Sequence, residues 1–200
     1  MADAEEGKDV VERASRGDPT AVEQLLQEHL PRLQAFVRLR MGALLRSREE
    51  SGDLVQSVCR VILTRQGEFR DADDEAFRRW LFTTAQRVVA DKVKYWRRDR
   101  RDAGREVHPA LDDPEVASMS AVFGTLLTPS RVASARERLA RFERAFDALP
   151  DDYRDVISLA RVLDLPHHDV AQRLGRSELA TRALLHRALA ALAGKLGEPR

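Results

Sequence analysis

Apolar residues recur every three or four positions over most of the chain, the spacing that predicts amphipathic helices. We find no run of alternating apolar and polar residues typical of a strand, and no internal repeat. The pattern predicts an all-α protein with helical segments near residues 19–37, 53–63, 77–98, 133–149, 150–160, 165–174 and 177–196.

Capping and breaking residues set the expected ends of these helices. Asp18 followed by Pro19 is a typical helix start, and Ser177 is a suitable N-cap for the last helix. Gly175 provides the positive φ that a tight turn requires. We expect Pro31 to kink or divide the first helix, because proline removes a backbone hydrogen bond.

Residues 103–133 interrupt the periodicity. They hold three prolines and two glycines among scattered serines, and they are too polar to pack as a domain. A connection this long is unusual within one compact domain. We therefore predict an N-terminal tail over 1–17 and two small helical domains over 18–102 and 134–197, joined by a flexible linker.

Composition excludes several classes of protein. The single cysteine, Cys59, permits no intramolecular disulfide framework and no multi-cysteine zinc site. The acidic N-terminus lacks the apolar core of a signal peptide, and no apolar run approaches the length of a membrane span. We expect a cytoplasmic protein without a membrane association.

Charge is unevenly distributed although the net charge is only +1. Residues 92–105 carry seven bases and two acids, and residues 176–200 carry five bases and two acids. Residues 106–130 between them carry four acids and no lysine or arginine. Two basic clusters, each beside a helical motif, favour a polyanionic partner over simple solvated helix faces.

Residues 165–192 read as a helix-turn-helix, with Ala171 where the two helices cross and Gly175 in the turn. The second helix of such a motif enters the DNA major groove by its N-terminal end. We expect its leading residues to contact bases and the later Arg187 and Lys195 to contact phosphates. The expected leading residues are Arg176, Ser177, Glu178, Thr181 and Arg182. On the pattern alone, a plain helical hairpin remains an alternative.

Aromatic and basic residues are interleaved from Phe77 to Arg101, a combination that suits single-stranded DNA. Trp80 lies on the apolar stripe, which indicates a place in the core. Four residues lie off that stripe and are expected at the surface: Phe82, Thr83, Gln86 and Arg87.

Together these features resemble the extracytoplasmic-function (ECF) sigma factors of bacterial RNA polymerase. The resemblance covers about residues 17–196 and rests on four segments in the family's order. These are GDPTAVEQLLQEHLPRLQAFV, DLVQSVCRVIL, FRRWLFTTAQRVVADKVKYWRRDRR and LPDDYRDVISLARVLDLPHHDVAQRLGRSELATRALLHRALAAL.

The resemblance implies a protein that binds core RNA polymerase, directs initiation and performs no chemistry itself, without cofactor or metal. It implies promoter DNA as the other partner, single-stranded at the downstream (−10) element and duplex at the upstream (−35) element. An anti-sigma factor is a typical partner of the family.

It also implies roles for individual residues. Those for polymerase are Asp53, Leu54, Gln56, Ser57 and Arg60. Those for the −10 element are Phe82, Thr83, Gln86, Arg87, Lys94, Arg97, Arg98, Arg100 and Arg101. Those for the −35 element are Arg176, Ser177, Glu178, Thr181, Arg182, His186 and Arg187. Ser57 stands where the family commonly has an acid, and residues 178–181 differ from many members.

Three other functions are compatible with parts of the sequence. A stand-alone helix-turn-helix regulator would bind duplex DNA without polymerase, but it does not explain the Asp53–Val58 motif. An enzyme could use His167, His168 and Asp169 as metal ligands, yet adjacent residues on a helix point to different faces. Cys59 is expected to be buried rather than reactive. A helical adaptor without DNA contacts is disfavoured by the basic clusters.

Overall fold

A computed structural model describes residues 2–98 and 135–197, and these residues contain helices and connecting turns but no strand. The all-α prediction is confirmed for them. The chain divides into two compact units, Met1–Pro109 and Ala110–Arg200, which are described separately here. The expected linker, residues 103–133, lies outside the described residues. None of the described helices is long and apolar enough to cross a membrane.

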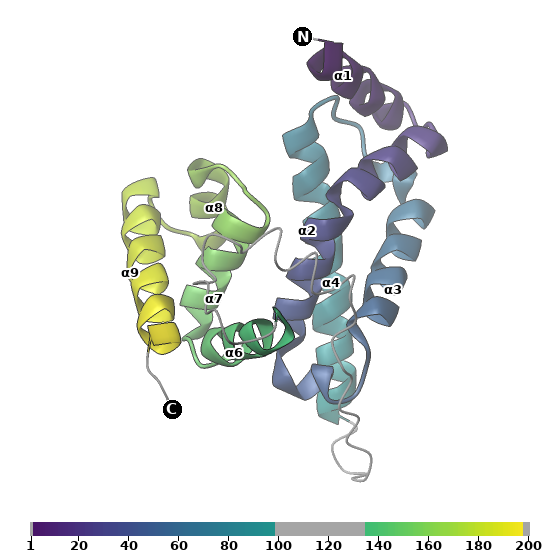
Figure 1. Cartoon of the computed structure of the whole chain (residues 1–200). Coiled ribbons are helices and arrows are strands. Elements are labelled where there is room, and N and C mark those ends of the chain that lie inside the picture. The colour runs from purple at the N-terminus through teal and green to yellow at the C-terminus, as the bar shows by residue number, and fades with distance from the viewer. Residues whose placement is uncertain (1, 99–134, 198–200) are drawn as a thin grey trace. The chain divides into compact units, whose positions relative to one another are not determined.

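The first unit is built around one long helix (Figure 1). Its elements are α1 (Ala2–Ser15), α2 (Pro19–Arg46), α3 (Ser51–Thr64), the 3₁₀ turn η1 (Gln66–Glu68) and α4 (Asp74–Arg98). Helix α2 packs against α1, α3 and α4, and α3 also packs against α4.

The residues expected as an N-terminal tail include helix α1. Val11 and Ala14 on α1 are buried, although the segment has too few apolar residues to predict a packed helix. Arg13 and Asp18 form an ion pair of 2.8 Å across the turn that follows. The helix is thus joined to the start of α2 by both packing and charge.

The start of α2 is as predicted, and Pro31 does not divide the helix. The Asp18 carboxylate accepts hydrogen bonds from the backbone N–H groups of Thr20 and Ala21 at 3.0 and 3.4 Å. Pro31 lies inside α2 on its exposed side, where water can solvate the carbonyl that proline leaves unpaired. The backbone departs from helical angles at Gly42 instead, where φ is 63°.

Aromatic side chains fill the core of the first unit, and they correct one surface prediction. Phe82 is fully buried and packs edge to face on Phe36 of α2, with ring centroids 5.5 Å apart. The expectation of a surface position is wrong because α4 is covered by both α2 and α3, so its buried face is wider than a single stripe.

The second unit consists of α6 (Ala135–Asp147), α7 (Asp151–Ile157), the π-helical η3 (Ser158–Val162) that continues it, α8 (His167–Leu174) and α9 (Glu178–Gly197). Helix α9 packs against α6, α7 and α8. Phe142 and Phe146 of α6 stack 6.2 Å apart and are fully buried, as are Val156 and Ile157 of α7. This core holds α9 with one face exposed.

Candidate nucleic-acid interface

A tight turn joins α8 to α9 and sets the angle of the second helix. Gly175 adopts φ 62° and ψ 35°, the left-handed conformation expected from the sequence. The N–H of Arg176 donates to the Ala171 carbonyl at 3.0 Å, and the N–H of Gly175 donates to the Gln172 carbonyl at 3.3 Å. These two bonds make a Schellman motif, so the helix-turn-helix geometry is fixed by backbone contacts.

Ser177 caps α9 as predicted. Its hydroxyl oxygen accepts a hydrogen bond from the Ala180 N–H at 3.2 Å. Thr181 was expected on the exposed leading face, and that placement is wrong. Its side chain is fully buried and its hydroxyl donates to the Ser177 carbonyl at 3.0 Å. Thr181 therefore stabilises the first turn of α9 from its buried side.

The exposed face of α9 carries the other predicted DNA residues. Leu184, Leu185, Ala188 and Leu192 form the buried stripe. Exposed residues are Ser177, Glu178, Arg182, His186 and Arg187, with Arg176 just before the helix. Arg182 pairs with Glu178 one turn earlier at 3.3 Å, and Arg176 approaches Asp152 of α7 at 3.7 Å. Both contacts are exposed and weak, so a phosphate or base edge can replace them.

The predicted polymerase residues lie together on α3. Asp53, Gln56 and Arg60 are exposed on one face, since positions three, four and seven apart are neighbours on a helix. Ser57 lies half-buried on the same face, and its hydroxyl donates to the Asp53 carbonyl at 2.9 Å. Leu54 is fully buried in the core and holds this face outward.

Helix α4 presents a polar face over its second half. Gln86, Arg87, Lys94 and Arg98 are exposed, and half-buried Thr83 lies on the same side. The Thr83 hydroxyl donates to the Arg79 carbonyl at 2.6 Å. Of the remaining predicted DNA residues of this unit, Arg97 belongs to α4, while Arg100 and Arg101 lie outside the described residues.

Sequence reasoning missed the residue that holds the basic end of α4 in place. The Glu49 carboxylate accepts hydrogen bonds from Lys92 Nζ at 2.8 Å and Trp96 Nε1 at 2.7 Å. Only 16% of the Glu49 side chain is exposed. Because more than forty residues separate Glu49 from these partners, no local pattern could have indicated the contact.

The loop before α4 has an aromatic anchor that the sequence did not single out. Phe69 is buried, with its ring 5.2 Å from Phe77 and 5.8 Å from Trp80. The Asp73 carboxylate caps α4 by accepting from the Ala76 N–H at 3.0 Å. The exposed Arg70 and Asp71 between these two anchors are thus held on a short, well-defined loop.

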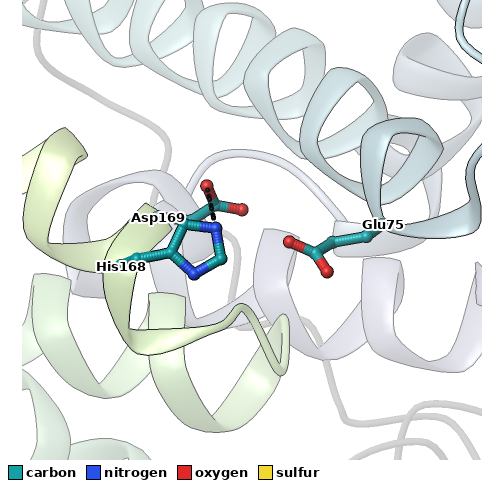
Figure 2. A group of neighbouring side chains, drawn as sticks. All are labelled: Glu75, His168 and Asp169. Atoms are coloured by element: carbon teal, nitrogen blue, oxygen red, sulfur yellow. Dashed lines mark ion pairs between the residues drawn. The ribbon is translucent and has the colours of Figure 1, made fainter.

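Two of the residues considered for enzyme chemistry, His168 and Asp169, are neighbours on α8. Figure 2 shows the exposed His168 against the buried Asp169 on α8, with Nε2 and Oδ1 3.3 Å apart. Glu75, also drawn there, belongs to α4 of the other unit, so the trio carries no argument for a metal. Cys59, which was expected to be buried, is half-buried, and this burial raises the pKa of its thiol.

Comparisons with known proteins identify both units. A family model described as Sigma-70 region 2 matches residues 25–102, and one described as Sigma-70, region 4 matches residues 139–192. Together the matched ranges cover more than half of the chain.

Full-length relatives agree with the family matches. The ECF RNA polymerase sigma factor SigD of Mycobacterium tuberculosis is 29% identical over 180 residues, which are 90% of this chain and 79% of SigD. The ECF RNA polymerase sigma factor ShbA of Streptomyces griseus is 29% identical over 184 residues, 92% of this chain and 91% of ShbA.

A solved structure shares the fold. CnrH, in complex with the cytosolic domain of CnrY, is 21% identical to this chain, with a TM-score of 0.58 over 94% of each chain.

Proposed function

We propose separate roles for the two units of this chain, which belongs to the sigma-70 family as an ECF sigma factor acting in transcription initiation. The domain of residues 18–102 binds core RNA polymerase and the unpaired −10 element. The domain of residues 134–197 binds the −35 duplex, and residues 103–133 connect them. The protein acts in the cytoplasm and performs no chemistry itself.

The observation that carries this proposal is the geometry of α8 and α9. The Schellman turn at Gly175 and the cap at Ser177 fix the start of α9, whose exposed face holds Arg182, His186 and Arg187. A helix with a rigid N-terminal end and a basic exposed face suits the major groove. Arg182 at the leading end is suited to base edges, and Arg187 further along to phosphates.

The first domain offers two separate exposed faces for two partners. Asp53, Gln56 and Arg60 on α3 form the face that we assign to polymerase, positioned by buried Leu54 and flanked by Ser57. On α4 the residues assigned to the −10 strand are Thr83, Gln86, Arg87, Lys94 and Arg98, with Arg97, Arg100 and Arg101 continuing the basic run. Phe82 contributes by positioning this face from the core.

A protein inhibitor is a further partner in this proposal. CnrH, which shares the fold, was solved with the cytosolic domain of CnrY. We assign an anti-sigma factor to this chain by that analogy. The rival function, a stand-alone regulator of duplex DNA, leaves the region 2 match over residues 25–102 without a purpose.

The polymerase face is tested by measuring affinity for bacterial core RNA polymerase. We expect the double variant Gln56→Ala/Arg60→Ala to bind about tenfold more weakly, because exposed side chains at the centre of an interface carry much of its energy. A matched control is Gln24→Ala/Gln27→Ala, which alters two exposed residues of α2 and should bind like the original chain. Equal affinities for both variants would exclude α3 as the polymerase face.

A further inference from the structure

Leu179 is the most exposed large apolar side chain among the described residues. It is 79% exposed, and the other exposed large hydrophobic residue, Tyr95 at 58%, leans against the ring of Trp96. Leu179 is the second residue of α9. Single exposed apolar side chains are common at protein surfaces, so the meaning of Leu179 depends on the residues that surround it on α9.

The position of Leu179 on α9 is central to the exposed face. Steps of four, three and four residues connect Leu179, Ala183, His186 and Ala190, so these residues form one line along the helix. All four are exposed, and the line runs opposite the stripe of Thr181, Leu184, Leu185, Ala188 and Leu192 that packs into the core. The two alanines allow a close approach of the helix to a flat or grooved surface.

The flanks of this line are basic. Arg182 lies on one side of it and Arg187 on the other, and both are exposed. An apolar centre between two cationic edges matches a DNA groove, in which base edges lie between two phosphate backbones. The charges therefore favour DNA over an apolar protein surface as the occupant.

The major groove displays one apolar group on its base edges, the C5-methyl group of thymine. We propose that Leu179 is a specificity-determining residue that packs against the C5-methyl of a thymine in the −35 duplex. This inference rests on the proposed function, because it requires α9 to enter the major groove by its N-terminal end. Arg182, paired with Glu178 at 3.3 Å, lies beside Leu179 for the neighbouring base or phosphate.

The experiment uses holoenzyme assembled from the full chain and bacterial core RNA polymerase. An upstream element is first selected from randomised duplexes, and each of its thymines is then replaced singly by uracil, which lacks only the methyl group. At one thymine we expect about fourfold weaker binding by the original chain, the effect of one methyl-sized contact. Leu179→Ala should bind the thymine and uracil duplexes equally.

Lys195→Ala is the matched control. Lys195 is exposed on the last turns of α9, far from the leading end, so its loss should lower affinity for both duplexes and keep the preference for thymine. Discrimination that persists unchanged in Leu179→Ala would overturn the inference, as would the absence of any methyl-sensitive thymine. Weaker holoenzyme assembly by Leu179→Ala, with discrimination intact in the holoenzyme that does form, would assign Leu179 to a protein contact instead. If the original holoenzyme selects no upstream element, the proposed function fails as well.

Discussion

At the scale of single residues, His29 and Asp74 connect α2 to the start of α4. His29 Nε2 and Asp74 Oδ1 are 3.0 Å apart, and the buried His29 ring stacks on Phe77 with centroids 5.7 Å apart. The hydrogen bond from His29 lowers the pKa of the Asp74 carboxyl, with burial opposing it and the charge of Arg78 adding to it. The folded state therefore favours the ionised carboxylate.

The sign of the pH dependence follows from that lowered pKa. Asp74 stabilises the fold above its unfolded pKa, and the contribution is lost as pH falls through the lower folded pKa. We expect Asp74→Asn to reduce the free energy of unfolding by about 1 kcal/mol at neutral pH, a modest figure because the carboxylate is partly exposed. Urea denaturation should show the gap between variant and original closing in acid, while Asp71→Asn on the exposed loop shows little gap. A gap that stays constant into acid would contradict this account of Asp74.

Glu49 is the second residue whose loss has a specific prediction. Its carboxylate joins Lys92 and Trp96, so Glu49→Ala leaves the indole N–H of Trp96 and the ammonium group of Lys92 without this acceptor. We expect a loss of about 1–3 kcal/mol in the free energy of unfolding, the usual effect of removing a hydrogen bond to a charged group. The exposed neighbour Glu50, whose side chain makes no cap contact on α3, provides the control Glu50→Ala. Equal unfolding midpoints for the two variants would show that Glu49 does not anchor α4.

At the scale of elements, the turn between α8 and α9 depends on the conformation of one glycine. A side chain at Gly175 meets no atom within 4 Å, but φ is +62° there, so Gly175→Ala is strained by the backbone alone. We expect a loss of about 1–2 kcal/mol in stability. Gly194→Ala, within α9 and also in open space, should be neutral or stabilising because alanine favours helix. Similar effects of the two changes on thermal unfolding would rule out backbone strain as the determinant of the turn.

Substitutions in α9 and in α4 should affect different steps, binding to the duplex and opening of the strands. Arg182→Ala on α9 should weaken binding to the −35 duplex about tenfold, the loss of one good base or phosphate contact, and leave strand opening from the bound state unchanged. Arg98→Ala on α4 should act mainly on opening, since we assign Arg98 to the unpaired strand. Binding is read by band shift and opening by permanganate reactivity of unpaired thymines. Equal effects of both variants on both steps would contradict the division of labour.

Local signals in the sequence predicted the helices well and their burial less well. Asp18, Gly175 and Ser177 act through contacts within five residues, so their roles follow from sequence alone. Phe82 and Thr181 were wrongly expected to be exposed. Their burial depends on which other helices pack against them, and local sequence patterns do not show that packing. Pro31 was expected to break α2, but its exposed side tolerates the lost hydrogen bond.

The site residues also divide into those that local sequence predicts and those that depend on contacts between distant segments. Asp53, Gln56 and Arg60 lie on one face because helical spacing alone brings them together. Glu49 could not be found, since its partners lie on a helix that begins twenty-five residues later in the chain.

At the scale of the whole molecule, the account depends on both units working with polymerase. Each unit has its own core, and each exposes polar and basic helix faces that this core does not use. A helix-turn-helix unit alone would suffice for a regulator that binds operators. In the proposed function, the α3 face of the first unit binds polymerase while its α4 face holds the unpaired strand.

The most direct test maps transcription start sites on genomic DNA with bacterial core RNA polymerase, with and without the purified chain. We predict initiation at defined sites only when the chain is present, and no tight duplex binding by the chain alone. Unchanged start sites, together with specific duplex binding in the absence of polymerase, would contradict it.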